Sequence, residues 1–179
     1  MNIQMHTRTP NTVVGMVCYL WRNENGFPEI YLAPKNPSSK SLERGLADKM
    51  NGYGGGMEKE DGGSLFVGTA REILQESGVI IEESVTEKVA EIFFVNTWGN
   101  YFCHFLLAKK FSGDPRPSQE MGIGKWFPFH LDSMPFDKMM DSDKRILPEI
   151  IAGKKFKATI IHDKNMMVTN FEIEYVDHF

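Results

Sequence analysis

The chain has 179 residues, enough for one domain with a substantial hydrophobic core. It is 41% hydrophobic and 25% charged, which are ordinary values for a globular protein. The net charge of −4 does not indicate the strongly basic surface of a nucleic-acid-binding protein, although a local basic pocket for a small anion is compatible with it.

The sequence predicts a cytoplasmic protein that neither spans nor binds a membrane. Residues 1–12 are polar and lack the apolar core of a signal peptide. The first apolar run, residues 12–21, is shorter than the roughly 20 residues of a membrane-spanning helix. The two cysteines, Cys18 and Cys103, lie in apolar runs and form no Cys-x-x-Cys motif, so buried thiols are favoured over a zinc site.

The first half of the chain predicts two strands, a polar loop and a helix. Residues 12–21 are β-branched and aromatic, as in a buried strand, and residues 29–34 predict a second strand that Pro34 ends. Residues 36–50 are polar and loop-like. The glycine-rich stretch NGYGGGMEKEDGG comes next, and a helix is expected from about Ser64, its N-cap, to the residue before Gly78, its C-terminal stop.

The second half of the chain predicts strands around one further helix. Two hairpins are expected, from residues 88–97 with 100–111 and from 157–163 with 166–176. Between them we expect a short strand at 125–129 and a helix at 142–153. Pro148 lies within this helix, so it either kinks the helix or weakens the prediction of one. Since no repeat or composition break divides the sequence, we expect a single α+β domain over residues 1–179, with a mixed sheet and few helices.

The helix before Gly78 carries two acids one turn apart. Because a helix has 3.6 residues per turn, Glu72 and Glu76 project from the same face, and Gln75 borders that face. Two like charges at this spacing cost roughly 0.2–0.5 kcal/mol, and a bridging divalent cation would reverse the sign. Carboxylate oxygens suit Mg²⁺, which also binds substrate phosphates. A solvated acidic face, with Arg71 in a surface ion pair, is the alternative that these residues alone leave open.

The opposite face of this helix is expected to pack on the core. Its side chains are apolar or small at helical spacing. They are Phe66, Ala70, Ile73, Leu74 and Ser77.

Residues 55–79 resemble a Nudix box, whose consensus is G-x5-E-x7-R-E-U-x-E-E-x-G-U, with U an aliphatic residue. The second half of the box is in register at Arg71, Glu72, Ile73, Glu76, Gly78 and Val79. The first acid of the family's E-E pair is Gln75 here. The first half is two residues longer than the consensus, so the early Glu position, counted back from Arg71, holds Gly63. Asp61 and Glu60 are the two acids that could replace it.

The resemblance extends over most of the chain and becomes narrower. NGYGGG at residues 51–56 resembles the Asn-Gly-Phe-Gly-Gly segment of MutT-type 8-oxo-dGTP diphosphatases. Residues 120–139 resemble the E-M-x-x-x-W-F-x-L-D-x-I-P-F-x-x-M segment of the same group, closest to the mammalian MutT homologues. The resemblance implies a Nudix-type mixed β-sheet sandwiched between helices. It also implies a small nucleotide substrate, cleaved to NMP and pyrophosphate with Mg²⁺ or Mn²⁺ as cofactor.

The resemblance implies a metal and catalytic centre around the box helix. Glu72 and Glu76 would hold the metal, Gln75 stands at a third position for it, and Arg71 would orient a helix carboxylate. Glu120 resembles a family acid that approaches the metals from the other side, and for Glu120 a solvated side chain is the alternative. Gly55 and its neighbour Gly56 would present backbone to the metal or the phosphates.

The resemblance also implies a pocket for the base. Asn51 and Asp143 resemble residues that read the base edge, and Lys35 resembles a lysine at the pocket rim. The alternatives are that Asn51 caps a turn, Asp143 caps the second helix and Lys35 is merely solvated. Met140 stands where the subgroup has a tryptophan that stacks on the base. Methionine offers less contact area and less specificity, so a purine pocket is expected but selectivity for 8-oxoguanine does not follow.

Two other functions stay open from the sequence. One is hydrolysis of another nucleoside diphosphate linked to a group X, such as a nucleotide sugar or a dinucleoside polyphosphate. The other is a catalytically weak nucleotide-binding module, which Gln75 and the longer box loop would explain.

Overall fold

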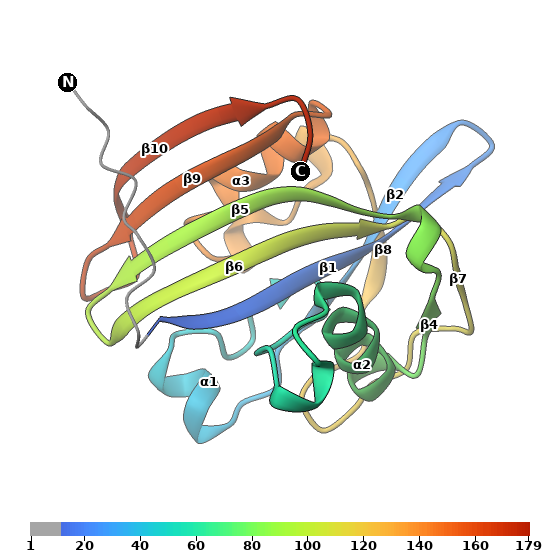
Figure 1. Ribbon diagram of the computed structural model, residues 1–179, viewed down its shortest axis with the longest axis horizontal. Coiled ribbons are helices and arrows are strands. Elements are labelled where there is room, and N and C mark those ends of the chain that lie inside the picture. Colours follow the sequence, from blue (N-terminus) through green and yellow to red (C-terminus); the bar gives the residue numbers. More distant parts are fainter. Residues whose placement is uncertain (1–11) are drawn as a thin grey trace.

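The computed structural model describes residues 12–179, and the polar stretch 1–11 lies outside the described residues. A twisted sheet runs through the molecule, and helices cover both of its faces (Figure 1). Within residues 12–179, no helix combines the length and the apolar character needed to cross a membrane.

The large sheet is mixed. Its strand order is β10-β9-β5-β6-β1-β2-β3, and β8 pairs with β2 beside this path. Strand β1 pairs with β6 in parallel, as does β5 with β9, whereas the other pairs are antiparallel. The strands are β1 (Val13–Glu24), β2 (Phe27–Pro34), β3 (Met50–Asn51), β5 (Thr86–Asn96), β6 (Gly99–Ala108), β8 (Lys125–Pro128), β9 (Lys155–His162) and β10 (Val168–Val176). A second, two-stranded sheet pairs β4 (Ile80–Ile81) with β7 (Phe111–Ser112).

The structure confirms the two predicted helices and contains a third. Helix α2 (Leu65–Ser77) begins after Ser64, whose hydroxyl accepts a hydrogen bond from Val67 N at 3.3 Å, and ends at Gly78 with φ 74°. Helix α3 (Asp143–Ile151) continues through Pro148. The expectation of an irregular loop over residues 36–50 is wrong in part, since it contains the short helix α1 (Ser39–Glu43).

The remaining helical segments are single 3₁₀ turns in the connections. They are η1 (Lys59–Asp61), η2 (Glu83–Val85), η3 (Leu131–Ser133) and η4 (Phe136–Lys138).

Each face of the sheet has its own hydrophobic cluster. On one face, Ile146 and Leu147 of α3 are fully buried in a cluster that includes Phe156 of β9. On the other face, Ile73 of α2 is fully buried in a cluster that includes Met16 of β1. The sheet is therefore sandwiched between α2 and α3, as a Nudix-type fold requires.

The buried face of α2 differs from the predicted one. Ile73 and Ser77 are buried as expected, but Leu74 is 51% exposed, so its assignment to the core was wrong. Thr69 and Glu76 are buried instead. The helix is rotated toward Glu76 because this carboxylate has hydrogen-bonding partners in the interior, which removes much of the cost of burying it.

Candidate active site

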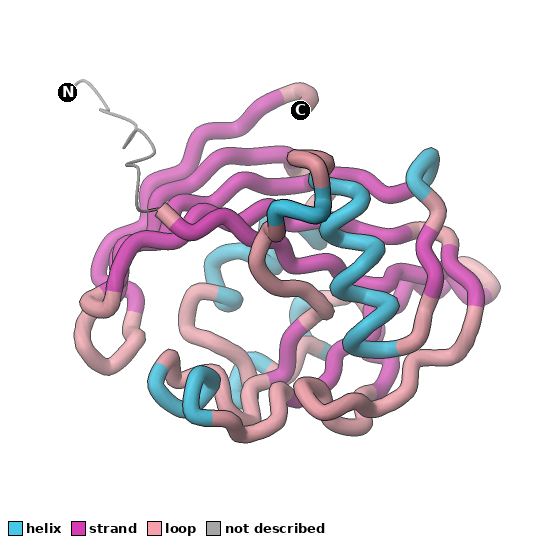
Figure 2. The backbone as a smooth tube through the Cα atoms, turned by 60° about the horizontal axis from the view of Figure 1, so that its bottom comes forward, coloured by secondary structure: helices cyan, strands magenta, loops and turns pink. Residues whose placement is uncertain are grey.

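The glycine-rich segment lies along β1, beneath α2. Cys18 and Tyr53 exchange backbone hydrogen bonds, Met16 N donates to Gly55 O at 2.9 Å, and Met57 N donates to Val14 O at 2.8 Å. A Cβ at Gly54 would collide with the carbonyl of Met16. These contacts fix the segment to the sheet. Figure 2 shows that loops and short helical turns gather on one side of the sheet.

Glycine at position 55 allows Glu72 to reach this segment. A Cβ on Gly55 would come within 2.5 Å of Glu72 Oε1, closer than real contacts allow. The carboxylate of Glu72 therefore lies directly against the backbone of the loop. The carbonyl of Gly55 already accepts hydrogen bonds from Met16 N and, at 3.4 Å, from Tyr101 Oη.

Glu76 is a buried carboxylate held by two donors. It is 3% exposed, and it accepts hydrogen bonds from Gly54 N at 2.7 Å and from Lys35 Nζ at 2.8 Å. Burial raises the pKa of Glu76, and the bonds from Lys35 and Gly54 hold part of that rise back. Lys35 Nζ also donates to Glu120 Oε2 at 3.1 Å, so one ammonium group bridges two of the predicted site acids.

Arg71 organises the first half of the site. Its Nε and Nη2 donate to the two oxygens of Asp61 at 2.8 and 2.9 Å, and its Nη1 donates to Glu72 Oε1 at 2.8 Å. Its Nη2 also donates to Gly56 O at 3.1 Å. Arg71 therefore contacts the helix carboxylate that the resemblance expects it to orient. Its fork occupies the carbonyl of Gly56, which the resemblance had assigned to the metal or the phosphates.

The two acids that could replace the early Glu of the box differ in their surroundings. Asp61 is 3% exposed, and besides its pair with Arg71 it accepts a hydrogen bond from Glu58 N at 2.7 Å. The bonds from Arg71 lower the pKa of Asp61 to about 2. Glu60 is exposed, so Asp61 is the acid that pairs with the box arginine.

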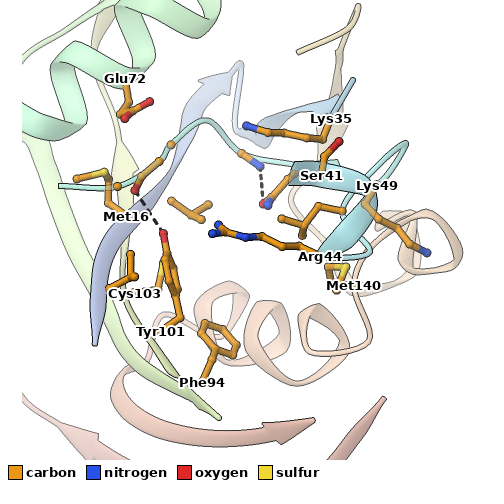
Figure 3. A pocket seen from close by; sticks show the side chains of 18 of the residues that line it. Met16, Lys35, Ser41, Arg44, Lys49, Glu72, Phe94, Tyr101, Cys103 and Met140 are labelled. Atoms are coloured by element: carbon orange, nitrogen blue, oxygen red, sulfur yellow. Dashed lines mark hydrogen bonds between the residues drawn. The ribbon is translucent and has the colours of Figure 1, made fainter. Parts of the chain in front are cut away.

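A cavity of about 430 Å³ connects the acids to the predicted base-binding residues. Glu72, Gln75 and Glu120 line one end of it, together with Lys35. The other predicted residues that line it are Asn51, Met140 and Asp143. Figure 3 shows Met140 among the lining side chains. Two predicted site residues, Glu76 and Arg71, do not line this cavity. Glu76 lines a second pocket together with Glu72, Gln75 and Glu120, and Arg71 donates a hydrogen bond to Glu72.

The two base-reading candidates also make the local contacts of their structural alternatives. Asn51 Oδ1 accepts a hydrogen bond from Gly52 N at 2.8 Å, which leaves its amide nitrogen available. Asp143 is 5% exposed, and its Oδ2 accepts a hydrogen bond from Met140 N at 2.9 Å. Burial raises the pKa of Asp143 to about 7, so near neutrality this side chain can either donate or accept a hydrogen bond.

Several residues of the cavity wall were not predicted from the sequence. They are Arg44 after α1, Phe94 and Asn96 on β5, Trp98 and Tyr101 in the following hairpin and His162 at the end of β9. The strand residues have a usable signal, because Phe94 and Asn96 are two apart and share one face of β5. Arg44 has none, since it lies in a polar segment without hydrophobic period.

The acids fit a cation, although they do not form a closed cage. Within residues 12–179, no three His, Cys, Asp or Glu side chains are grouped closely enough to hold a metal ion. The ammonium of Lys35 nevertheless contacts one oxygen of Glu76 and one oxygen of Glu120. These two carboxylates are therefore close enough to bind the same cation. Gln75 is exposed, and its Oε1 lies 3.4 Å from Arg71 Nη1.

Known proteins are similar to this chain in sequence and in fold. No family model matches the sequence. The chain is 28% identical over 153 residues to the oxidized purine nucleoside triphosphate hydrolase of Mus musculus, covering 84% of this chain and 94% of that protein. It is 30% identical over 112 residues to the protein of the same name from Danio rerio, covering 62% and 67%. The crystal structure of the MutT protein from Bacillus halodurans superposes with a TM-score of 0.71 at 16% identity, covering 90% and 97%. By these similarities in sequence and fold, the chain belongs to the MutT-like Nudix hydrolases.

Proposed function

We propose that the protein is a divalent-metal-dependent pyrophosphohydrolase that cleaves a purine nucleoside triphosphate, with oxidised purines among its substrates, to NMP and pyrophosphate. The observation that carries this proposal is a single cavity with carboxylates at one end and Asn51 and Asp143 at the other. Such a cavity suits a ligand that has a phosphate chain at one end and a hydrogen-bonding base at the other. The names of the mouse and zebrafish relatives support the same substrate class.

Glu72, Glu76 and Glu120 are the residues that would hold Mg²⁺ or, in its place, Mn²⁺. A bound divalent ion supplies a polarised phosphoryl oxygen and a water of lowered pKa at this end of the cavity. The chain itself contributes orientation, because Arg71 fixes Glu72 and the Gly54 amide fixes Glu76. Lys35 pairs with Glu76 and Glu120, and once a metal ion took over these carboxylates it would neutralise charge on the phosphate chain.

The base end favours a purine. Asn51 can donate through its amide nitrogen, and Asp143 can donate when protonated and accept when ionised. Phe94 and Met140, which both line the cavity, offer apolar surface to the ring. Since Met140 covers less of a base than an indole would, we expect a preference for purines rather than strict selectivity for one oxidised base.

A substrate panel tests the proposal. Purine and pyrimidine nucleoside triphosphates, 8-oxo-dGTP, nucleotide sugars and dinucleoside polyphosphates are incubated with Mg²⁺, and phosphate is measured after coupling to inorganic pyrophosphatase. Alkaline phosphatase replaces the pyrophosphatase for the substrates whose phosphates are capped. Glu76→Gln serves as the inactive control. The highest kcat/KM for a purine triphosphate supports the proposal, and the highest value for a capped diphosphate would replace it with that activity.

The same panel addresses the weak-binding alternative, which the exposed position of Gln75 favours. Nucleotide binding by wild-type protein without turnover in either Mg²⁺ or Mn²⁺ would show a binding module. Turnover that Glu76→Gln abolishes would exclude it.

A further inference from the structure

The segment between β2 and β3 forms one wall of the cavity and is internally fixed. It closes on itself through Lys35 N to Lys49 O at 2.9 Å and Asp48 N to Lys35 O at 2.8 Å. Inside it, the hydroxyl of Ser41 donates to Asn36 O at 2.9 Å, and the carbonyl of Ser41 accepts from Leu46 N at 2.8 Å. Such a closed network gives the residues it carries a defined position.

Arg44 extends from this segment into the cavity. It follows α1 directly, before Gly45 turns the chain with φ 66°. Its side chain is half-buried, and the guanidinium points into the cavity (Figure 3). The guanidinium carbon lies 5.1 Å from the centre of the Trp98 ring, which also lines the cavity.

Among the side chains that the structure describes, which exclude those of residues 1–11, 39 and 40, none forms a hydrogen bond or ion pair with the guanidinium of Arg44. Its described contact is with the Trp98 ring. The two lysines that line the cavity differ from Arg44, because Lys35 is paired with two acids and Lys49 points away from the cavity centre (Figure 3). A half-buried guanidinium with five unused donors is unusual in a folded protein and suits an anionic ligand.

Neighbouring groups place this charge toward the acidic end of the cavity. The guanidinium of Arg44 points toward the hydroxyl of Tyr101 (Figure 3). The Tyr101 hydroxyl in turn donates to Gly55 O at 3.4 Å, and Gly55 lies against Glu72. At the base end, by contrast, the positive charge that acts on Asp143 is that of Lys49.

We propose that Arg44 binds a phosphate oxygen of the nucleotide in the cavity. The inference rests on the proposed function in that it takes the ligand to be a nucleotide. The acidic end of the cavity repels a polyanion, and within the described part of the chain Arg44 is a cavity cation without a carboxylate partner. Because guanidinium is always charged and donates in a fork, it can hold two oxygens of one phosphate.

The test compares Arg44→Gln and Arg44→Lys with Arg116→Gln, a matched control at an exposed arginine outside the cavity. The kcat/KM is measured for the four dNTPs at two salt concentrations. Arg44→Gln is expected to lower kcat/KM by about 10- to 100-fold, the scale of a lost charged hydrogen bond, by the same factor for every base. The salt dependence should become shallower, and Arg44→Lys should recover part of the loss because it keeps the charge.

Other results would overturn the inference. A loss confined to some bases would make Arg44 a base-reading residue, and kcat/KM within about twofold of wild type for all bases would give it no role in binding. If the wild-type protein hydrolyses no dNTP, the proposed function fails first, and Arg44 is then judged by calorimetric binding of dGTP in EDTA. Weaker binding by Arg44→Gln than by Arg116→Gln still supports a phosphate contact, whereas equal binding, or none by any variant, refutes it.

Discussion

Replacing Asp61 with asparagine tests the assignment of the displaced box acid. In the folded chain, two hydrogen bonds from Arg71 lower the pKa of Asp61 from 3.8 to about 2. Each pKa unit corresponds to about 1.4 kcal/mol, so the ionised carboxylate stabilises the folded state by about 2–3 kcal/mol at neutral pH. Little discount for solvent applies, since Asp61 is 3% exposed. Asparagine keeps an oxygen for Glu58 N but loses the charge that pairs with Arg71.

The assay is urea unfolding at pH 7 of wild type, Asp61→Asn and the control Glu60→Gln, which changes an exposed acid in the same turn. We expect Asp61→Asn to lower the free energy of unfolding by about 2–3 kcal/mol and the melting temperature by about 4–10 °C. Glu60→Gln should stay within about 0.5 kcal/mol of wild type.

The stabilisation by Asp61 should also depend on pH in a defined direction. Because the pKa of Asp61 is lower in the folded than in the unfolded chain, its stabilisation is complete above about pH 4 and is lost as the pH falls toward 2. Asparagine does not titrate, so the difference between wild type and Asp61→Asn should shrink over this range. The assignment would be refuted by equal stabilities at pH 7, by an unchanged difference at low pH, or by a larger effect of Glu60→Gln.

Three further predictions concern activity. Glu76→Gln should lower kcat by about 10²–10⁴-fold in saturating Mg²⁺, because a positioned metal-binding acid is lost, and wild-type turnover would show that Glu76 does not serve the metal. Gln75→Glu should keep activity and tighten metal affinity, measured as the Mg²⁺ concentration for half-maximal rate, since it adds a carboxylate beside Glu72; weaker metal binding would give Gln75 a separate role. Asp143→Ala should lower kcat/KM for the best purine and flatten the ranking among bases, whereas a lower melting temperature with the ranking preserved would leave Asp143 only as a cap.

The parts of the fold that were predicted correctly are those with strong local signals. Helix α2 combines a hydrophobic period with Ser64 before it and Gly78 after it, and all three act locally. The face that the helix buries was less predictable, because it depends on whether Leu74 or Glu76 points to the interior. Glu76 is the buried residue because Lys35, which is distant in sequence, donates a hydrogen bond to it.

The parts that were missed depend on contacts between distant segments. The parallel pairing of β1 with β6 has no counterpart in local sequence pattern. Helix α1 is polar and short, and it is held by the hydrogen bonds of Ser41 rather than by a hydrophobic face, so nothing in its sequence marked Arg44 as a cavity residue. The choice between Asp61 and Glu60 likewise required the position of Arg71 in space.

The central claim is that the carboxylate end of the cavity cleaves a purine nucleoside triphosphate with a divalent ion. Its most direct test is chromatographic analysis of the products from dGTP and 8-oxo-dGTP, with Mg²⁺ and with EDTA, for wild type and Glu76→Gln. We predict NMP and pyrophosphate in equal amounts from wild type with Mg²⁺, and neither product above background in EDTA or from Glu76→Gln. Release of NDP and phosphate, or equal yields in Mg²⁺ and EDTA, would contradict the claim.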